Sequence, residues 1–309
     1  MPKPFRFSAQ VQQPMSGREW AALARKVEDL GYSALTMSDH FGDQLAPLAG
    51  MMAAAAATTS LRIGTLVFDN DYRHPLVLAK EAATIDLLSD GRLELGLGAG
   101  WMISDYDASG MPYDPAGVRI DRFEEGLAVV KGLMADGPFS FSGKHYTITE
   151  HDGTPKPKQR PHPPIIIGGG GRRVLGIAGR EADIVSINAN LKDGKGGAET
   201  APNLAPEVTT QKVQWAREGA GDRWADIELH ALVGFCVFTD HPMQVAEAMA
   251  PAFGIAPAEA LHVPVGLIGT VDSMVEELQW RRETWGFSYI TVEGPWEEFA
   301  PVVSRLAGT

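Results

Sequence analysis

A run of four glycines, Gly168 to Gly171, is the segment of the sequence best suited to bind a ligand. It follows Ile165 to Ile167, which predict a short buried strand, and it precedes a helical pattern that ends at Gly179. Glycines at a strand-to-helix junction leave backbone N–H groups uncovered, and the helix N-terminus adds partial positive charge. The segment therefore predicts a phosphate site with Arg172 or Arg173 as charge partner, although a glycine run can also be only a flexible turn.

The spacing of these glycines does not fit a nicotinamide-binding fold. Gly168, Gly170 and Arg173 do not form the pattern G-x-G-x-x-G. The next predicted strand, residues 183–187, leads into Asn188 rather than into the acidic residue that would bind a ribose. We therefore expect the phosphate to belong to another cofactor or to the substrate.

His40 is the strongest candidate for proton transfer. It follows a predicted strand at residues 33–38, its side chain titrates near neutral pH, and the adjacent Asp39 could fix its tautomer or charge. The structural alternatives are an interior histidine bonded to backbone and a cap or turn role for Asp39. The sequence shows no metal-ligand spacing, no G-x-S-x-G motif and no cysteine nucleophile. A bound organic cofactor would therefore carry the difficult chemical step.

Short apolar strands alternate with longer helical patterns along almost the whole chain. The predicted strands are residues 5–11, 33–38, 61–68, 92–97, 165–167 and 183–187, one within 228–238, and 288–292. Eight strands, each followed by a helix, predict a (β/α)8 TIM barrel with insertions, and a doubly wound sheet is the alternative. The insertions are a two-stranded excursion at 139–148 and a glycine-rich loop or lid at 192–205. No linker divides the chain, so we expect one domain over residues 1–309.

In a barrel of this kind, the active site lies at the carboxyl ends of the strands. The loops after them should therefore carry the functional side chains, and the stretches 101–117 and 192–205 should shape the substrate pocket. The candidate positions are Gln10, Ser38 to Phe41, Thr65 to Asn70, Gly98 to Trp101, Gly168 to Gly171, Asn188, Asn190 and Glu293.

Composition excludes several classes of protein. The net charge of −12 over 309 residues argues against non-specific binding of nucleic acid, which needs a basic face. The single cysteine, Cys236, rules out an internal disulfide and suits a reducing compartment. The N-terminus lacks an apolar signal segment, and no window approaches the length of a membrane span. We therefore expect a cytoplasmic protein without membrane partners.

Several motifs, taken in chain order, resemble the luciferase-like flavin and deazaflavin enzymes. Within that superfamily, the branch most similar is the actinobacterial one that uses coenzyme F420, a deazaflavin. The motifs are Gly31-Tyr32 leading to Ser38-Asp39-His40-Phe41, then Leu61 to Thr65, Tyr72 to Pro75, Gly91 to Trp101, Pro163 to Gly171, and Gly269-Thr270. Each motif alone is weak, but the ordered set covers nearly the whole chain.

The resemblance implies a cofactor laid across the mouth of the barrel, with His40 and Asp39 as catalytic residues beside its reactive ring. It also implies a non-proline cis peptide at Thr65-Leu66, as a bulge against the ring. The cofactor contacts implied are Asp39, His40, Thr65, Leu66, Gly98, Ala99, Gly100, Gly168, Gly169, Gly170, Gly171 and Arg172. The substrate contacts expected are Gln10, Trp101 and Tyr106.

The function expected from the resemblance is hydride transfer between coenzyme F420 and a small organic substrate. The alternatives are an FMN-dependent monooxygenase and a non-catalytic flavin- or deazaflavin-binding protein. Relatives that act on a sugar phosphate carry a tryptophan four residues after the histidine and an acid after the Gly-x-Gly turn. This chain has Gln44 and Trp101 at those places, which argues against that substrate. Related barrels often form homodimers, and the alanine-rich helix at residues 46–57 could supply such a contact.

Overall fold

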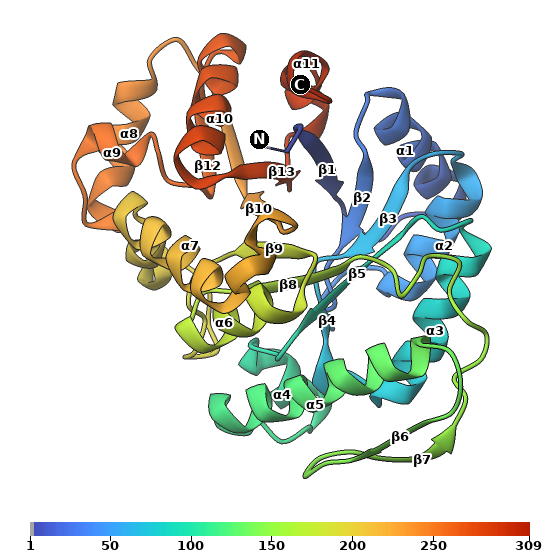
Figure 1. Ribbon diagram of the computed structural model, residues 1–309. Coiled ribbons are helices and arrows are strands. Elements are labelled where there is room, and N and C mark those ends of the chain that lie inside the picture. Colours follow the sequence, from blue (N-terminus) through green and yellow to red (C-terminus); the bar gives the residue numbers. More distant parts are fainter. Residues whose placement is uncertain (1–2) are drawn as a thin grey trace.

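The computed structural model describes residues 3–309 and is built around a closed barrel of parallel strands (Figure 1). Its strands are β1 (Arg6–Gln10), β2 (Ala34–Met37), β3 (Arg62–Thr65), β5 (Leu93–Gly98), β8 (Ile165–Gly169), β9 (Ile184–Ile187), β10 (Glu228–Val233) and β13 (Phe287–Val292). Neighbours pair in the order β3-β2-β1-β13-β10-β9-β8-β5, and the pairing of β3 with β5 closes the ring. The predicted TIM barrel is confirmed, and this closure excludes the doubly wound sheet.

Helices surround the barrel because each crossover covers the outer face of the strands (Figure 1). Those that follow barrel strands are α1 (Gly17–Asp29), α2 (Pro47–Ala57), α3 (Pro75–Leu88), α5 (Ala116–Met134), α6 (Arg172–Glu181), α7 (Pro206–Ala220), α10 (Val271–Trp285) and α11 (Trp296–Leu306). Their local signals are ordinary ones. Helix α1, for example, begins at a capping box of Ser16 and Glu19 and buries Trp20, Ala24 and Val27 along one face.

Shorter elements decorate this frame. The helical ones are α4 (Ile103–Ser109), α8 (Pro242–Phe253), α9 (Pro257–Ala260), and the 3-10 turns η1 (Asn70–Tyr72), η2 (Ala198–Leu204) and η3 (Gly221–Ala225). The strands are β4 (Phe68–Asp69), the hairpin of β6 (Phe139–Ser142) and β7 (Thr147–His151), and the parallel pair of β11 (Phe235–Phe238) and β12 (Gly266–Gly269). The expected excursion is therefore the β6–β7 hairpin, and part of the expected loop at 192–205 forms η2. Within residues 3–309, we find no helix that combines the length and the apolar character needed to cross a membrane.

Two predicted strands are each split in the structure. Residues 61–68 form β3 and β4, with a non-proline cis peptide between Leu66 and Val67. The prediction of Thr65-Leu66 was therefore wrong by one residue. Thr65 is still paired with Met37 on β2, and its hydroxyl donates to the carbonyl of Gly96, so the strand continues through it. The region 228–238 forms β10 in the barrel and β11 outside it.

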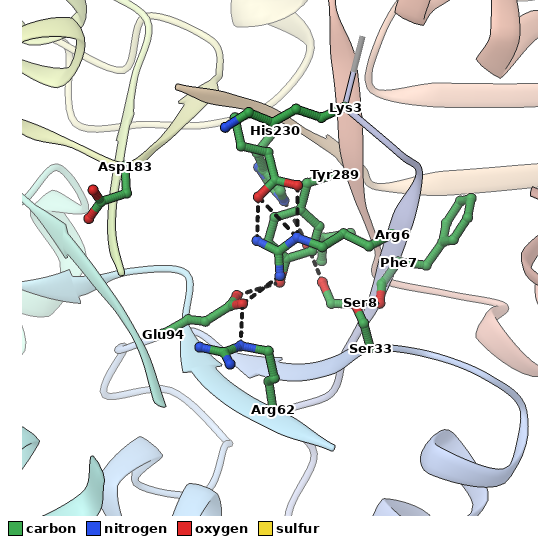
Figure 2. A network of polar contacts seen from close by, with 12 residues as sticks. Lys3, Arg6, Phe7, Ser8, Ser33, Arg62, Glu94, Asp183, His230 and Tyr289 are labelled. Carbon is green, nitrogen blue, oxygen red and sulfur yellow. Dashed lines mark hydrogen bonds and ion pairs between the residues drawn. The ribbon is translucent and has the colours of Figure 1, made fainter. Parts of the chain in front are cut away.

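Paired charges on buried and part-buried side chains close the amino end of the barrel (Figure 2). The guanidinium of Arg6 bonds both carboxylate oxygens of Glu228 and contacts Glu94, and Arg62 donates to Glu94 at 2.7 Å. The hydroxyl of Tyr289 adds a third donor to Glu94 at 3.0 Å. Burial alone would raise the pKa of Glu94, but the two arginines hold it below its usual value. The charged side chains at this end of the barrel are therefore paired with one another.

Helix α2, where a dimer contact was expected, packs apolar side chains against other parts of the same monomer. Met51 and Ala54 are completely buried, and Trp20 of α1 donates its indole N–H to the carbonyl of Gly50 at 2.8 Å. A homodimer stays a prediction.

Candidate active site

A cavity of about 550 Å³ opens at the carboxyl ends of the barrel strands. Its walls come from the loops after β1, β2, β3, β5, β8, β9 and β13, as the barrel geometry requires. Of the cofactor and substrate contacts that the resemblance implies, those that line it are Gln10, Asp39, His40, Leu66, Gly98, Ala99, Gly100, Trp101 and Gly168 to Gly171. Three of these implied contacts, Thr65, Tyr106 and Arg172, are not among its lining residues, whereas Arg173, the other predicted charge partner, is.

His40 is oriented by Asp105 rather than by Asp39. Its Nδ1 lies 2.7 Å from Oδ2 of Asp105, which comes from α4. Asp105 also accepts from the hydroxyl of Tyr72 at 2.9 Å, and the indole of Trp101 packs edge-on to the imidazole at 5.6 Å between centroids. The bond to a carboxylate makes Nδ1 the protonated nitrogen, so Nε2 is left to exchange a proton with a ligand. Among the described residues, we find no partner for Nε2.

Asp39 has a different role from the one expected at the histidine. Its carboxylate accepts bidentate hydrogen bonds from the guanidinium of Arg73, at 2.6 and 3.2 Å, and a third from the backbone N–H of Asp69 at 3.1 Å. Asp39 therefore ties the end of β2 to the segment after β3, while one side of it still faces the cavity.

Asp69, which lies within the predicted stretch Thr65 to Asn70 but was expected to have no particular role, is a titratable residue of the cavity wall. Burial, and then the nearby charges of Asp71 and Asp39, raise the pKa of Asp69 to about 7. Its carboxylate accepts the N–H of Asp71 at 2.8 Å, and the hydroxyl of Tyr106 lies 3.3 Å away. It sits beneath the turn at Gly100, where an added Cβ would come within 2.6 Å of a carboxylate oxygen. A carboxyl group that titrates near neutrality in a cleft is a candidate functional group.

Tyr106 lies in the wall behind the cavity. Its side chain is almost completely buried, and its hydroxyl donates to Asp71 at 2.9 Å. Asp71 also forms a bidentate ion pair with Arg122 of α5, with both contacts at 2.7 Å. The expected substrate residue therefore connects α4 to α5.

Gly168 to Gly171, which we call the glycine seat, form an uncovered stretch of backbone at the start of α6. Gly171 is the N-cap of this helix and has no side chain to cap its N–H groups. A Cβ on Gly170 would come within 2.2 Å of the backbone of Ala189, whereas a Cβ on Gly171 would meet only Asn190, at 3.9 Å. The absence of side chains thus leaves backbone and space for an anion, and the segment fits a phosphate group.

The two arginines after the glycines point in different directions. The side chain of Arg172 is 74% exposed and approaches Glu218 at 3.4 Å. Arg173 lines the cavity, but its guanidinium bonds Asp121 and Glu124 at 2.6 and 2.7 Å. The seat therefore depends on backbone dipoles more than on a free arginine beside it.

The opposite wall carries polar groups on β1 and after β13. Nε2 of Gln10 donates to Glu293 at 3.1 Å, and burial raises the pKa of Glu293. Gln44 is occupied in holding Ser38, since its amide donates to the carbonyl of Ser38 and accepts from its hydroxyl, both at 2.8 Å. Trp101 stands against His40. Gln44 and Trp101 stand where relatives that act on a sugar phosphate carry a tryptophan and an acid. In this protein they contact Ser38 and His40 instead.

The loop after β9 closes one side of the cavity. Leu191, Lys192 and Leu204 line it, and the carbonyl of Gly194 accepts the N–H of Ile103 on α4 at 3.1 Å. Lys212 of α7, almost completely buried, donates to the carbonyl of Asn188 at 2.7 Å and to that of Asn203. This ammonium fixes both ends of the loop to α7. Burial lowers the pKa of Lys212 to about 8.

Comparison with known proteins found a matching family model and several similar proteins. Residues 3–285 match the family model described as luciferase-like monooxygenase. The chain is 28% identical over 250 residues to an F420-dependent glucose-6-phosphate dehydrogenase of Kineococcus radiotolerans, covering 78% of this chain and 70% of that protein. It is 34% identical over 142 residues to an FMNH(2)-dependent dimethylsulfone monooxygenase of Pseudomonas putida, covering 46% of this chain. That match spans only 39% of the relative's own length.

Solved structures show the same fold at low identity. The coenzyme F420-dependent tetrahydromethanopterin reductase from Methanopyrus kandleri superposes with a TM-score of 0.77 at 19% identity and covers 98% of both chains. An F420-dependent secondary alcohol dehydrogenase gives a TM-score of 0.75 at 19% identity, with 97% of both chains covered.

Proposed function

The chain is an enzyme of the luciferase-like monooxygenase family, and from that premise we propose that it transfers hydride between coenzyme F420 and a small organic substrate. One observation carries the proposal. The imidazole of His40 and the glycine seat of Gly168 to Gly171 face the same cavity, so a ligand with a phosphate on the seat can extend toward a proton-transfer group. Relatives named for F420 dependence support the cofactor, both by sequence and by fold.

We assign the cofactor-binding roles to backbone more than to side chains. The amides of Gly168 to Gly171 would take the phosphate, and the turn of Gly98 to Gly100 with Leu66 and Val67 would border the ring system. When bound, the deazaflavin would donate or accept the hydride. His40 would give or take the accompanying proton at Nε2, while Asp105 and Tyr72 hold the imidazole in place.

We propose that the substrate is small and is not a sugar phosphate. Gln44 is bonded to Ser38, and Trp101 packs on His40, so neither position offers the groups that such a substrate would need. Gln10 and Glu293 provide one polar site on an otherwise mainly apolar wall. Small alcohols and unsaturated carbonyl compounds are therefore the first classes to assay.

An FMN-dependent monooxygenase is the second candidate. The similarity to a dimethylsulfone monooxygenase favours it, and a phosphate monoester would fit the glycine seat as well as the phosphodiester of F420 would. A non-catalytic pigment-binding protein is the third reading, and it predicts binding without turnover.

Calorimetric titration with F420 and FMN in parallel tests the cofactor, and we expect F420 to bind more tightly. Tight binding of FMN with none of F420 would replace the proposal by the monooxygenase. The variant His40→Ala tests the chemistry, since we expect retained cofactor binding with turnover reduced by about a hundredfold or more. Unchanged turnover in an assay that works for the parent protein would remove His40 from the mechanism.

A further inference from the structure

Arg119, on the first turn of α5, is a buried cation of the cavity wall without an acidic partner. Arg119 is among the residues that line the cavity, and it is only 3% exposed. One terminal nitrogen donates to the carbonyl of Asp114, and the other lies 3.2 Å from the hydroxyl of Tyr113. Over residues 3–309, no carboxylate lies within ion-pair distance of this guanidinium, and its Nε has no hydrogen-bond partner.

The surrounding side chains explain how the cation is tolerated but do not neutralise it. The ring of Tyr113 lies 4.1 Å from the guanidinium carbon, and the ring of Tyr106 lies 6.0 Å away, so both give cation–π attraction. The acids near Arg119 in the sequence are engaged elsewhere: Asp121 pairs with Arg173 at 2.6 Å, and Asp114 directs its carboxylate to Arg122 at 2.8 Å and offers Arg119 only its carbonyl.

A second buried arginine shows what full compensation looks like in this protein. Arg281 is completely buried and pairs with Glu277 at 2.7 Å. Its remaining N–H groups donate to carbonyls, among them those of Val263 at 2.9 Å and Gly266 at 2.7 Å. A buried guanidinium without such partners costs free energy, and in Arg119 the unpaired nitrogen belongs to a side chain of the cavity wall.

We propose that Arg119 binds an anionic group, a phosphate or a carboxylate, of a ligand in the cavity. Of the two arginines that line the cavity, Arg173 already has Asp121 and Glu124, so Arg119 is the one with charge to offer. The guanidinium of Arg173 also reaches the carbonyl of Gly117 at 3.3 Å, which joins the start of α6 to the first turn of α5. The anion can therefore belong to the cofactor or to the substrate, and the inference rests on the proposed function only for the first source.

Three pairs of ligands, each of one anionic member and one partner without that anion, separate these sources. The cofactor pairs are FMN with riboflavin, and F420 with its phosphate-free ribityl-deazaflavin core, and binding is measured by calorimetry. The substrate pair is benzoate and benzyl alcohol, titrated into cofactor-loaded protein. The variants are Arg119→Met, which keeps the side-chain length, and Arg119→Lys, which keeps the charge without the planar fork. Arg25→Met, an exposed arginine of α1, is the matched control for the loss of one positive charge.

We expect Arg119→Met to lose about tenfold or more in affinity for the anionic member of one pair and less than about twofold for its neutral partner. A loss confined to FMN and F420 assigns the anion to the cofactor phosphate, and a loss confined to benzoate assigns it to the substrate. Arg119→Lys should lie between the parent and the Met variant.

Equal losses for charged and neutral ligands, or no loss in any pair, would overturn the proposal. If the Met variant unfolds, as its melting temperature would reveal, the same comparison with Arg119→Lys decides. If the parent protein binds neither flavin nor deazaflavin, the proposed function fails, but the benzoate pair still tests Arg119 on the protein as isolated.

Discussion

Glu94 at the amino end of this barrel and the polar groups of the cavity at its carboxyl end differ in how completely they are paired. At the amino end, Glu94 accepts from Arg6, Arg62 and Tyr289, so its charge is matched inside the protein (Figure 2). At the carboxyl end, one oxygen of Gln10 and the Nε of Arg119 have no partner within residues 3–309, and Asp69 titrates near neutrality. Removing one partner of a buried ion pair costs stability, whereas an unpaired polar group beside a cavity has hydrogen-bonding capacity left for a ligand. The amino end therefore serves the stability of the barrel, and the carboxyl end is suited to bind a ligand.

The strongest test of this difference is Glu94→Ala. We expect the free energy of unfolding to fall by about 3 kcal/mol, because the part-buried Arg6 and Arg62 would lose a carboxylate and the fully buried hydroxyl of Tyr289 would lose its acceptor. The matched control is Glu297→Ala, which removes a surface ion pair with Lys26 and should cost less than about 1 kcal/mol. Urea denaturation measures both losses in free energy of unfolding. Equal losses would contradict the idea that the paired charges at the amino end stabilise the barrel more than a surface ion pair does.

At the other end, Asp105→Asn should affect turnover rather than folding. An amide can donate to Nδ1 of His40 and favour the wrong tautomer, so we expect kcat to fall about tenfold to a hundredfold with cofactor affinity unchanged. Asp107→Asn, an exposed change on the same helix, is the control. A change in affinity with kcat preserved would show that Asp105 serves binding.

Substitutions at two glycines of the glycine seat distinguish its role in packing from its role in ligand binding. Gly170→Ala places a Cβ 2.2 Å from the backbone of Ala189, so we expect a loss of about 1–3 kcal/mol in stability. Gly171→Ala has no such clash and should weaken binding of a phosphate-bearing ligand with little change in melting temperature. If both variants melt alike and bind alike, the seat is only a turn.

The smallest effect concerns pH and Asp69. The pKa of this carboxyl is raised from an ordinary value of 3.8 to about 7, so the folded state holds the proton more tightly than the unfolded state. Stability from this group is therefore present at low pH and is lost as pH rises from about 4 to about 7. Asp69→Asn removes the dependence, and the parent should lose about 1 kcal/mol or more relative to the variant between pH 5 and pH 8. Parallel melting curves for the two proteins at both pH values would contradict the raised pKa.

The fold could be predicted from sequence because its signals are local. Apolar strands such as Ile165 to Ile167 and glycines at the strand ends carry their meaning in a few neighbouring residues. The cavity-lining glycines and His40 follow from the same logic, since the carboxyl ends of barrel strands meet at one face.

What sequence could not give is the pairing of distant side chains and the direction of neighbouring ones. Asp105 lies 65 residues from His40, and nothing next to either residue announces the contact. Arg172 and Arg173 are adjacent on a helix, so their side chains diverge by about 100° and only one can face the cavity. Tyr106 was misplaced in the same way, because the seven residues of α4 are too few to show which side is buried.

The ammonium of Lys212 has a consequence for the integrity of the chain. It bonds the carbonyls of Asn188 and Asn203, while Lys192 and Lys195 between them are exposed and open to trypsin. A protease that cuts at these lysines would therefore produce two fragments whose severed ends remain attached to one helix. Such a nicked protein should migrate as two bands in denaturing gels and still elute as one species from a sizing column.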